Sequence, residues 1–377
     1  MRYILFTFSL LIILSCGNKK TAEKQIFQAG DTLSISHAKG FSIIAYDGFK
    51  ILEVKNPWPK AQRSYKYLLV EDSSRVPVDM IYDHKINIPI KQLVVTSTTH
   101  IPSLESLGVS KALIGFPGLD YISSPETRKL IKENKIAELG KNESINTEIL
   151  ISISPDAVIG FAVTGSNKTF SIIENSGIPV LFNGDWIEES PLGKAEWIKF
   201  FGVLFNKSAE ADSYFSNVER NYNEAKALAS TAKFSPSVLS GSMYKDQWYV
   251  PYGNSWPARF IKDANARYIY EDTNGSGSMA LAFESVLGEA QNADYWIAPG
   301  QFISFKQLDE SSNHYRRFNA VEKQQVYTYS NTTGESGGVL YYELAPGRPD
   351  LVLKDLISIF HKDLLPHHKP VFFKPLD

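Results

Sequence analysis

Short apolar segments alternate with candidate helices on both sides of one long helical stretch, and this alternation limits the fold more than any other feature. On the N-terminal side, the candidate strands are 92–96, 112–115, 157–160 and 178–182. The helices expected between them are 102–107, which Gly108 closes, and segments near 124–134, 147–152 and 169–176. Strands that alternate with helices predict sheets covered by helices, which is the α/β class.

The stretch 189–232 interrupts this alternation with connecting helices. Ser190 and Pro191 read as an N-cap followed by proline in the first helical turn, and Ser208 is the candidate N-cap of a second helix. That second helix carries one apolar stripe and is expected to run to about Ala229, a length of roughly 33 Å. It is either a large helix packed within one domain or a connector between two, and its position between two α/β halves favours the connector.

An internal repeat supports the division into two halves. Residues 148–160 and 284–300 each read as a short helix, an aspartate turn and an apolar strand that ends in glycine. Asp156 and Asp294 hold the same place in the two copies. The expected fold is α/β, with two Rossmann-like lobes bridged by a long connecting helix and a cleft between the lobes.

The first residues have the composition of an export signal. Arg2 precedes an apolar run, 3–14, that is too short to span a membrane comfortably as a helix. The run leads into Cys16, the sole cysteine, in a context that resembles the lipobox of bacterial lipoproteins. We expect a signal peptide over 1–15, a lipidated Cys16 and a tether over 16–30; the alternative is an ordinary signal peptide with an incidental thiol. Some lipoproteins carry an acidic pair after the lipidated cysteine as a signal for export to the cell surface, and no such pair follows Cys16. This favours a lipid-anchored protein of the bacterial cell envelope that faces the periplasm.

Segment 31–90 differs from the rest because it contains short runs rich in Ile, Val, Tyr and Phe without helices between them. Turn signals such as Asp47-Gly48 separate these runs. A β-rich N-terminal subdomain is therefore expected over 31–90. The other expected parts are an N-terminal α/β lobe over 91–188, connecting helices over 189–232 and a C-terminal α/β lobe over 233–377.

Charge and motif content exclude several functions. Thirty-nine basic residues against 41 acidic ones give a formal charge of −2, so nucleic acid is not an expected partner. The seven histidines lack zinc-site spacing and one cysteine cannot form a Cys-rich site, so we expect neither a protein-bound metal nor a cofactor. The segment 334–338 looks like the nucleophile loop of a serine protease around Ser336. It lacks the histidine signature of that class, and we interpret it as a glycine-rich connecting loop.

Aromatic residues mark the candidate binding cleft. A ring-rich segment interrupted by Gly253 and two prolines is typical of a loop, and rings in loops commonly contact a ligand. His100 directly follows the first strand of the α/β region, where loops face the mouth of a sheet. Core packing is the alternative for each ring taken singly, but the set favours a ring-lined cleft. Its members are Trp186, Tyr244, Trp248, Tyr249, Tyr252, Trp256, Tyr341 and Tyr342.

Four segments, taken in order, carry a resemblance to a known family: 94–109, 154–160, 191–200 and 348–360. Together with the lipoprotein-like start, they resemble the substrate-binding lipoproteins of bacterial ABC importers for iron complexes and vitamin B12. This resemblance covers about 91–366. It implies two α/β lobes joined by one long rigid helix, ligand capture in the cleft, and delivery to a membrane permease with little hinge closure.

The resemblance also implies how the protein meets its permease. Family members commonly dock through one surface glutamate on each lobe. The matching positions here hold Pro102 and Lys262. Glu105 and Asp263 are the nearest acidic substitutes, and they are the docking residues expected.

The expected function is therefore non-catalytic capture of an iron-siderophore or related iron complex, a small-molecule metal chelate. Tryptophan rings would stack on the chelate, while Arg259 and Arg348 would neutralise an anionic one. The expected ligand-binding residues are His100, Trp186, Tyr244, Trp248, Trp256, Arg259, Tyr342 and Arg348. Three alternatives stay open: a cobalamin-binding protein, an exported serine hydrolase that uses Ser336, and a surface adhesin or assembly lipoprotein that uses 31–90.

Overall fold

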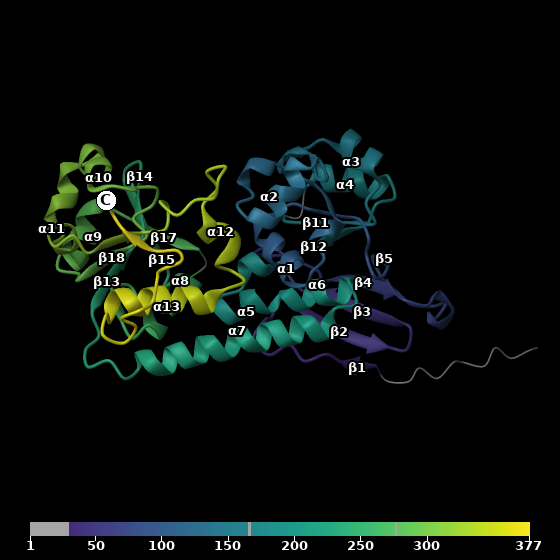
Figure 1. Cartoon of the computed structure of the whole chain (residues 1–377), viewed down its shortest axis with the longest axis horizontal. Helices are drawn as coiled ribbons and strands as arrows, with labels where there is room; N and C mark the ends of the chain where they lie inside the picture. The colour runs from purple at the N-terminus through teal and green to yellow at the C-terminus, as the bar shows by residue number, and fades with distance from the viewer. Residues whose placement is uncertain (1–29, 165–166, 276) are drawn as a thin grey trace, which may run out of the picture.

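The computed structural model describes residues 30–164, 167–275 and 277–377, and shows two α/β lobes above one long helix, α7 (Ser208–Ala229) (Figure 1). This confirms the fold class expected from the sequence. The predicted signal peptide and the lipidation site Cys16 lie outside the described residues. Within the described part of the chain, no helix is both long enough and apolar enough to cross a membrane.

An N-terminal five-stranded sheet precedes the first lobe. Its strands, in sheet order, are β1 (Asp31–Thr32), β2 (Phe41–Tyr46), β3 (Phe49–Val54), β4 (Tyr65–Val70) and β5 (His84–Asn87). The Asp47-Gly48 turn joins β2 to β3, and Gly48 has a φ of 82°, which glycine adopts without a steric penalty. Phe41 and Leu52 face inward and share one hydrophobic core with the strands of the first lobe. The sheet is therefore packed against that lobe.

The first lobe contains a parallel sheet in the order β12-β11-β6-β7-β8. This order corresponds to the Rossmann arrangement, in which the connections reverse direction between β6 and β11. The strands are β6 (Leu93–Val95), β7 (Leu113–Phe116), β8 (Ala137–Glu138), β11 (Ala157–Gly160) and β12 (Val180–Phe182). The helices are α1 (Ile101–Ser106), α2 (Pro125–Lys132), α3 (Thr147–Ile153) and α4 (Lys168–Asn175), with a small hairpin of β9 (Gly140–Lys141) and β10 (Ser144–Ile145).

The second lobe contains a sheet in the order β16-β13-β18-β19-β20, parallel except for β20 at its edge. Here the connections reverse between β13 and β18, as in flavodoxin-like folds. The strands are β13 (Ser237–Ser240), β16 (Arg267–Tyr268), β18 (Tyr295–Ile297), β19 (Val326–Thr328) and β20 (Lys374–Pro375). The helices are α8 (Trp256–Asp263), α9 (Phe283–Ala290), α10 (Phe305–Ser311), α11 (Asn319–Glu322), α12 (Leu340–Leu344) and α13 (Pro349–Phe360).

The ring-rich segment 244–256 is not the loop that the sequence predicts. It belongs to an antiparallel sheet of β14 (Ser242–Tyr244), β15 (Gln247–Pro251) and β17 (Ser278–Leu281), and it ends at the start of α8. Side chains alternate along β15, so Trp248 and Val250 are buried while Tyr249 is exposed. Strand alternation therefore divides the rings between the core and the surface.

The connecting helices are α5 (Pro191–Glu196), α6 (Ile198–Leu204) and α7. Ser190 caps α5 as predicted, its hydroxyl accepting the backbone N–H of Gly193 at 2.9 Å. The predicted N-cap role of Ser208 is wrong: Ser208 is the first helical residue, and Lys207 precedes it without a side-chain cap. The buried stripe of α7 consists of Ala211, Phe215, Val218, Tyr222, Ala225 and Ala229.

Two buried glutamates fasten the N-terminal segment to the connecting helices. Glu196 accepts the backbone N–H groups of Ser36, His37 and Ala38 at 2.7–2.9 Å. Glu188 accepts those of Lys39 and Gly40, together with the indole N–H of Trp197. A run of five backbone donors is thus satisfied by two carboxylates.

The internal repeat has a structural counterpart. Asp156 precedes β11, and its carboxylate accepts the backbone N–H groups of Lys91 and Gln92, just before β6. Asp294 precedes β18, and its carboxylate accepts the backbone N–H of Ser237, the first residue of β13. Each aspartate joins the starts of two neighbouring strands, so the repeated motif performs the same task in both lobes.

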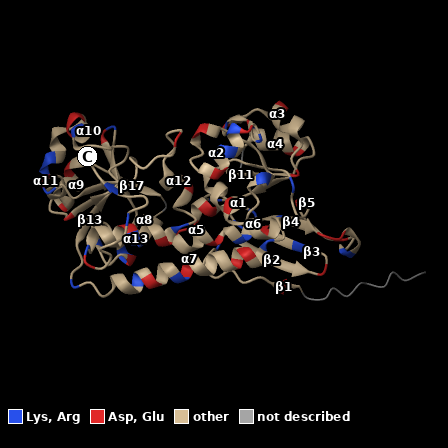
Figure 2. Cartoon of the chain, viewed as in Figure 1, with Lys and Arg blue, Asp and Glu red and all other residues tan. Residues whose placement is uncertain are grey.

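Figure 2 shows acidic and basic residues on both lobes and along α7.

Candidate functional site

A cavity of about 420 Å³ lies between the two lobes. Volumes of ~300–1,000 Å³ are typical of small-molecule sites. The first lobe contributes Thr99, Asp185 and Trp186, the connecting helix α5 contributes Lys194, and the second lobe provides the remaining wall. The cavity is therefore the cleft that a two-lobed fold predicts.

The topology of the sheets explains the position of this cavity. Ser240 and Ile297 end the neighbouring strands β13 and β18, and both line the cavity with the residues that follow them. These strands flank the point at which the connections of the second sheet reverse. Ligands of open α/β sheets bind outside the carboxyl ends of strands at such a point. Thr99, which comes after β6 of the first lobe, faces the same cavity.

A column of parallel rings forms one wall. Tyr341 stacks on Tyr329 with ring centroids 4.2 Å apart and an interplanar angle of 5°, and Trp256 stacks with Tyr341 at 5.9 Å and 19°. The hydroxyl groups of Tyr329 and Tyr342 lie 3.3 Å apart. Burial raises the pKa of Tyr329 and of Tyr341, so both stay neutral phenols. The rings cover one another's faces, so the wall is an apolar column of stacked rings that carries the Tyr329 and Tyr342 hydroxyl groups close together.

Another part of the cavity lining is polar. Lys194 is 7% exposed, and its ammonium donates to the carbonyl oxygens of Asp185 and Trp186, each at 2.9 Å. The same nitrogen lies 5.2 Å from the ring centroid of Trp256, which joins the polar side to the ring wall. Burial lowers the pKa of Lys194, whereas the nearby carboxylates of Asp185 and Glu188 raise it.

Three of the eight residues that the sequence predicts as ligand-binding line this cavity: Trp186, Trp256 and Tyr342. Trp186 meets Phe161 edge to face at 5.7 Å, and its indole N–H is buried without a partner among the described residues. Tyr342 is 48% exposed, so one side of its ring is open to solvent. The structure brings these three residues together from both lobes.

Two of the predicted ligand-binding residues belong to the protein interior. Trp248 is fully buried and packs against Trp296 at 5.1 Å and Phe318 at 5.3 Å. His100 is 1% exposed and packs against Phe201 at 5.5 Å. The prediction was wrong for both: Trp248 lies on the inward face of β15, and His100 lies in a 3-10 turn after β6 with its ring packed into the core.

The other three predicted residues lie elsewhere on the molecule. Tyr244 is 65% exposed and does not line the cavity. Arg259 faces a separate cavity of about 360 Å³, which lies between the N-terminal sheet, the loop 187–190 and α8. Arg348 forms a two-pronged ion pair with the buried Asp350, at 2.8 and 2.9 Å. Its guanidinium group is therefore occupied by the start of α13, and neither arginine can neutralise a ligand in the cleft.

Lys194 and Asp185 line the cavity but are not among the residues predicted from the sequence. A lysine within a helix ordinarily faces solvent, and Lys194 is buried only because α5 lies beneath the loop that follows β12. Asp185 follows the end of β12 closely, which is the signal that could have identified it. Tyr329 follows the end of β19 in the same way.

The two acidic residues expected to dock a permease are engaged within the protein. Asp263 is 8% exposed; its carboxylate accepts the Tyr222 hydroxyl at 2.7 Å and pairs with Lys226 at 2.9 Å. Glu105 accepts the hydroxyl groups of Ser124 and Thr127. The prediction of Asp263 as a surface docking residue was wrong, since α7 covers it, and the Glu105 carboxylate is held by the start of α2.

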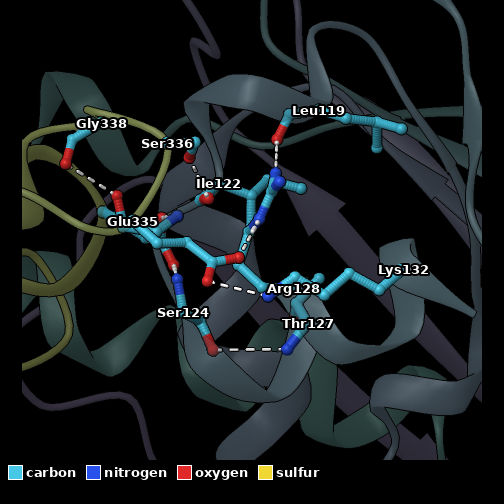
Figure 3. Close-up of polar contacts among 11 residues, drawn as sticks. Leu119, Ile122, Ser124, Thr127, Arg128, Lys132, Glu335, Ser336 and Gly338 are labelled. Carbon is cyan, nitrogen blue, oxygen red and sulfur yellow. Dashed lines mark hydrogen bonds and ion pairs between the residues drawn. The ribbon is translucent and has the colours of Figure 1, made fainter.

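A strap formed by residues 334–343 crosses from the second lobe and binds the first lobe at the start of α2 (Figure 3). The Ser336 hydroxyl donates to the Ile122 carbonyl at 3.2 Å, and Glu335 pairs with Arg128 and Lys132. A Cβ atom on Gly338 would lie 2.6 Å from the Ser123 hydroxyl, so this close approach requires glycine. The glycines of the segment 334–338 thus allow contact between the lobes.

Glu343 fastens the same strap from α12. Its carboxylate accepts the backbone N–H groups of Ser123 at 2.6 Å and Ser124 at 3.0 Å. Burial raises the pKa of Glu343 to about 7 with support from nearby Glu105, while the two N–H groups oppose the shift. Because Tyr341 and Tyr342 lie on the same helix, the strap fixes part of the ring wall against the first lobe.

His100 makes the stability of the folded protein depend on pH. Burial lowers its pKa from 6.5 to about 4, and the carboxylate of Asp185 opposes this shift. The unfolded chain therefore binds a proton that the folded chain does not, and stability is lost as pH falls from about 6.5 through 4. We expect a loss from this group of roughly 3 kcal/mol at pH 4, measured by urea unfolding at pH 7 and pH 4.

The His100→Leu variant isolates this effect. Its unfolding free energy should fall less steeply with acid than that of the wild type. The His367→Leu variant is the control, since His367 is exposed. Equal pH dependence in the wild type and in His100→Leu would contradict the assignment.

The described residues also define what the site lacks. They contain no group of three or more His, Cys, Asp or Glu side chains placed to hold a metal ion. Ser336 makes its hydrogen bond to a backbone carbonyl, and no histidine among the described residues is bonded to it.

Comparison with known proteins agrees with this geometry. A family model described as a periplasmic binding protein matches residues 93–333. An uncharacterised lipoprotein of Methanocaldococcus jannaschii is 27% identical over 385 aligned positions, which cover 96% of this chain and 90% of the relative. At that coverage the alignment includes most of the N-terminal sheet, which lies outside the family match.

Solved structures share the two-lobed fold. A periplasmic heme binding protein from Pseudomonas aeruginosa has a TM-score of 0.57 at 15% identity, covering 76% of this chain and 98% of that one. A possible iron-binding (periplasmic solute-binding) protein from Staphylococcus epidermidis has a TM-score of 0.56 at 16% identity, covering 72% of this chain and 99% of that one. At these identities the likeness shows the fold.

Proposed function

Because the chain belongs to the periplasmic binding protein family, we propose that it is the lipid-anchored substrate-binding protein of an ABC importer. In this proposal it captures an iron complex in the cavity between its lobes and delivers it to a membrane permease. The observation that carries the proposal is a ring-lined cavity at the carboxyl ends of strands from both lobes. A ligand bound there is held by both lobes at once.

The aromatic wall of the cavity favours a metal complex with an unsaturated face as the ligand. Trp256, Tyr341 and Tyr329 present parallel rings, and Trp186 contributes a further ring from the first lobe. Two solved proteins of similar fold are described as binding heme and as possibly binding iron, which supports an iron complex over an unrelated solute. Contact of an unsaturated ligand with the exposed parts of these rings supplies apolar burial in the cleft.

Anchoring at Cys16 completes the proposal. The relative that aligns with 96% of this chain is named as a lipoprotein. A lipidated Cys16 would hold the protein at the outer face of the cytoplasmic membrane, in the periplasm, within reach of its permease. Each CH₂ group buried in the bilayer adds about 0.8 kcal/mol of membrane affinity.

Cobalamin is the second candidate ligand. Among the described residues, the charged ones that line the cavity are one lysine and one aspartate, and this balance suits a large corrinoid that is nearly neutral. The serine hydrolase alternative receives no such support, because Ser336 lies in the strap, outside the residues that line the cavity. We therefore propose binding without catalysis.

Tryptophan fluorescence of the full chain in detergent tests the proposed function. The protein is titrated with ferric hydroxamate, ferric catecholate, ferric citrate, heme and cobalamin, with metal-free chelators and matched absorbers as controls. Trp186 and Trp256 line the cavity, so a bound metal complex should quench their emission with a saturable curve. Saturable quenching by an iron complex supports the proposal. Saturable quenching by cobalamin alone would identify cobalamin as the ligand instead. Absence of saturable quenching by every compound would reject both candidate ligands.

A further inference from the structure

The cavity has a charge balance that narrows the class of ligand. Among the described residues that line it, only Lys194 and Asp185 carry full charges. Both are buried, at 7% exposure each. The remaining polar side-chain groups are neutral: the Trp186 indole and hydroxyl groups such as those of Thr99, Ser242 and Tyr342. A ligand therefore meets one positive and one negative charge, which sum to zero.

Lys194 has spare capacity to bind an acceptor. Its ammonium group carries three N–H donors, and two of them are used by the carbonyl oxygens of Asp185 and Trp186. No partner for the third is found among the described residues. The indole N–H of Trp186, which also lines the cavity, has no partner within the described chain either. Two donors on the polar side of the cavity thus lack an acceptor among the described residues, and the indole nitrogen of Trp186 is enclosed by protein atoms.

Asp185 supplies the opposing charge. Its backbone carbonyl is bound by Lys194, but within the described structure its carboxylate accepts no hydrogen bond and forms no ion pair. A second anion placed beside this carboxylate would bring like charges together in a site that excludes most water. Asp185 therefore disfavours any ligand that carries several negative charges.

We infer that the cavity selects a metal complex with a net charge near zero, which presents one acceptor group to Lys194 and Trp186, and that it rejects polyanionic complexes. This inference rests on the proposed function and deepens it. The two arginines that would have suited an anionic chelate do not line the cavity, since Arg348 is paired with Asp350 and Arg259 faces a separate cavity. Ring stacking and a single acceptor contact then provide the binding energy, without neutralisation of a large charge.

Equilibrium dialysis of the full chain in detergent tests the inference with two ferric complexes of similar size. A ferric trihydroxamate is neutral, whereas a ferric tris-catecholate carries three negative charges. We expect the neutral complex to bind at least about 100-fold more tightly, because juxtaposed like charges disfavour the wrong partner strongly. Equal or tighter binding of the trianion overturns the inference alone. No binding of either complex, of heme or of cobalamin overturns the proposed function as well.

The Asp185→Asn variant tests whether the Asp185 carboxylate causes the discrimination against the trianion. Asp185→Asn keeps the shape of the side chain and removes its charge, so it should strengthen binding of the trianion about tenfold or more. The control is Glu189→Gln, in the same loop but exposed. If Asp185→Asn has no more effect on trianion affinity than Glu189→Gln, the assignment to Asp185 is wrong.

Lys194→Met tests the acceptor contact. It should weaken binding of the neutral complex about tenfold, since a hydrogen bond to a charged donor is lost. Lys129→Met removes the same charge from an exposed position on α2 and should leave affinity unchanged. Equal affinities in the two lysine variants, with circular dichroism showing both to be folded, would contradict a ligand contact at Lys194.

Discussion

Replacement of Glu196 by alanine is expected to lower the free energy of unfolding by about 3–5 kcal/mol, the range found when one partner of a buried ionic contact is removed. The Glu196 side chain is fully buried and accepts three backbone N–H groups from residues 36–38. It also pairs with Lys199 at 3.0 Å. The variant leaves those donors without an acceptor in the interior, and urea unfolding at pH 7 measures the loss.

Two further variants identify the cause of that loss. Glu189→Ala removes an exposed carboxylate from the preceding loop and should cost little. Glu196→Gln keeps one acceptor oxygen and should lie between Glu196→Ala and the wild type. Equal stability of Glu196→Ala and Glu189→Ala would show that this carboxylate does not hold the N-terminal segment.

The charge of Glu196 adds a dependence on pH. Burial raises the pKa of Glu196, but the three N–H groups and Lys199 outweigh it, and the net pKa is lowered from 4.5. A lowered pKa in the folded state contributes stability above the unfolded value, and this contribution disappears as pH falls through the folded pKa. The difference between the wild type and Glu196→Gln should therefore shrink in acid.

Replacement of Trp256 by alanine is expected to weaken ligand binding at least about 30-fold, corresponding to the 2 kcal/mol or more that a central aromatic contact contributes. Trp256 stands at the end of the ring column, stacked with Tyr341, and its face lies 5.2 Å from the ammonium of Lys194. Its removal therefore takes away both an aromatic contact surface and the ring that lies next to the Lys194 ammonium. Equilibrium dialysis with the complex that binds best measures the change.

Tyr244→Ala is the matched control for this experiment. Tyr244 is an exposed ring of the same lobe, outside the cavity, and its loss should leave affinity unchanged. Trp256→Phe keeps a ring at the site and should restore part of the affinity. A loss as large for Tyr244→Ala as for Trp256→Ala would place the ligand outside the cavity.

Much of the architecture could be predicted from the sequence because it depends on local patterns. The stripe from Ala211 to Ala229 repeats at helical spacing, so α7 ends where the sequence indicates. Asp156 and Asp294 could be identified as equivalent because each stands between a helix and a short apolar strand. In these cases the residues that determine the structure are neighbours in the chain.

The candidate site was harder to predict because its chemistry depends on which way side chains point. Trp248 and Trp256 have similar sequence surroundings, yet β15 turns the first into the core and α8 presents the second to the cavity. The guanidinium group of Arg348 forms an ion pair with Asp350, two residues along the chain, instead of facing the cavity. Lys194 is drawn under a loop by carbonyl groups of residues 185 and 186, a contact that depends on the packing of α5 against the first lobe.

Anomalous X-ray scattering from crystals grown with the complex that binds best tests the central claim most directly. Iron and cobalt each have an absorption edge, so the metal of either candidate ligand can be located without a model of the ligand. The account predicts one strong anomalous peak between the two lobes, bordered by Trp186, Trp256 and Tyr341. A peak outside this cavity, in crystals of protein that binds the complex saturably in solution, would contradict it.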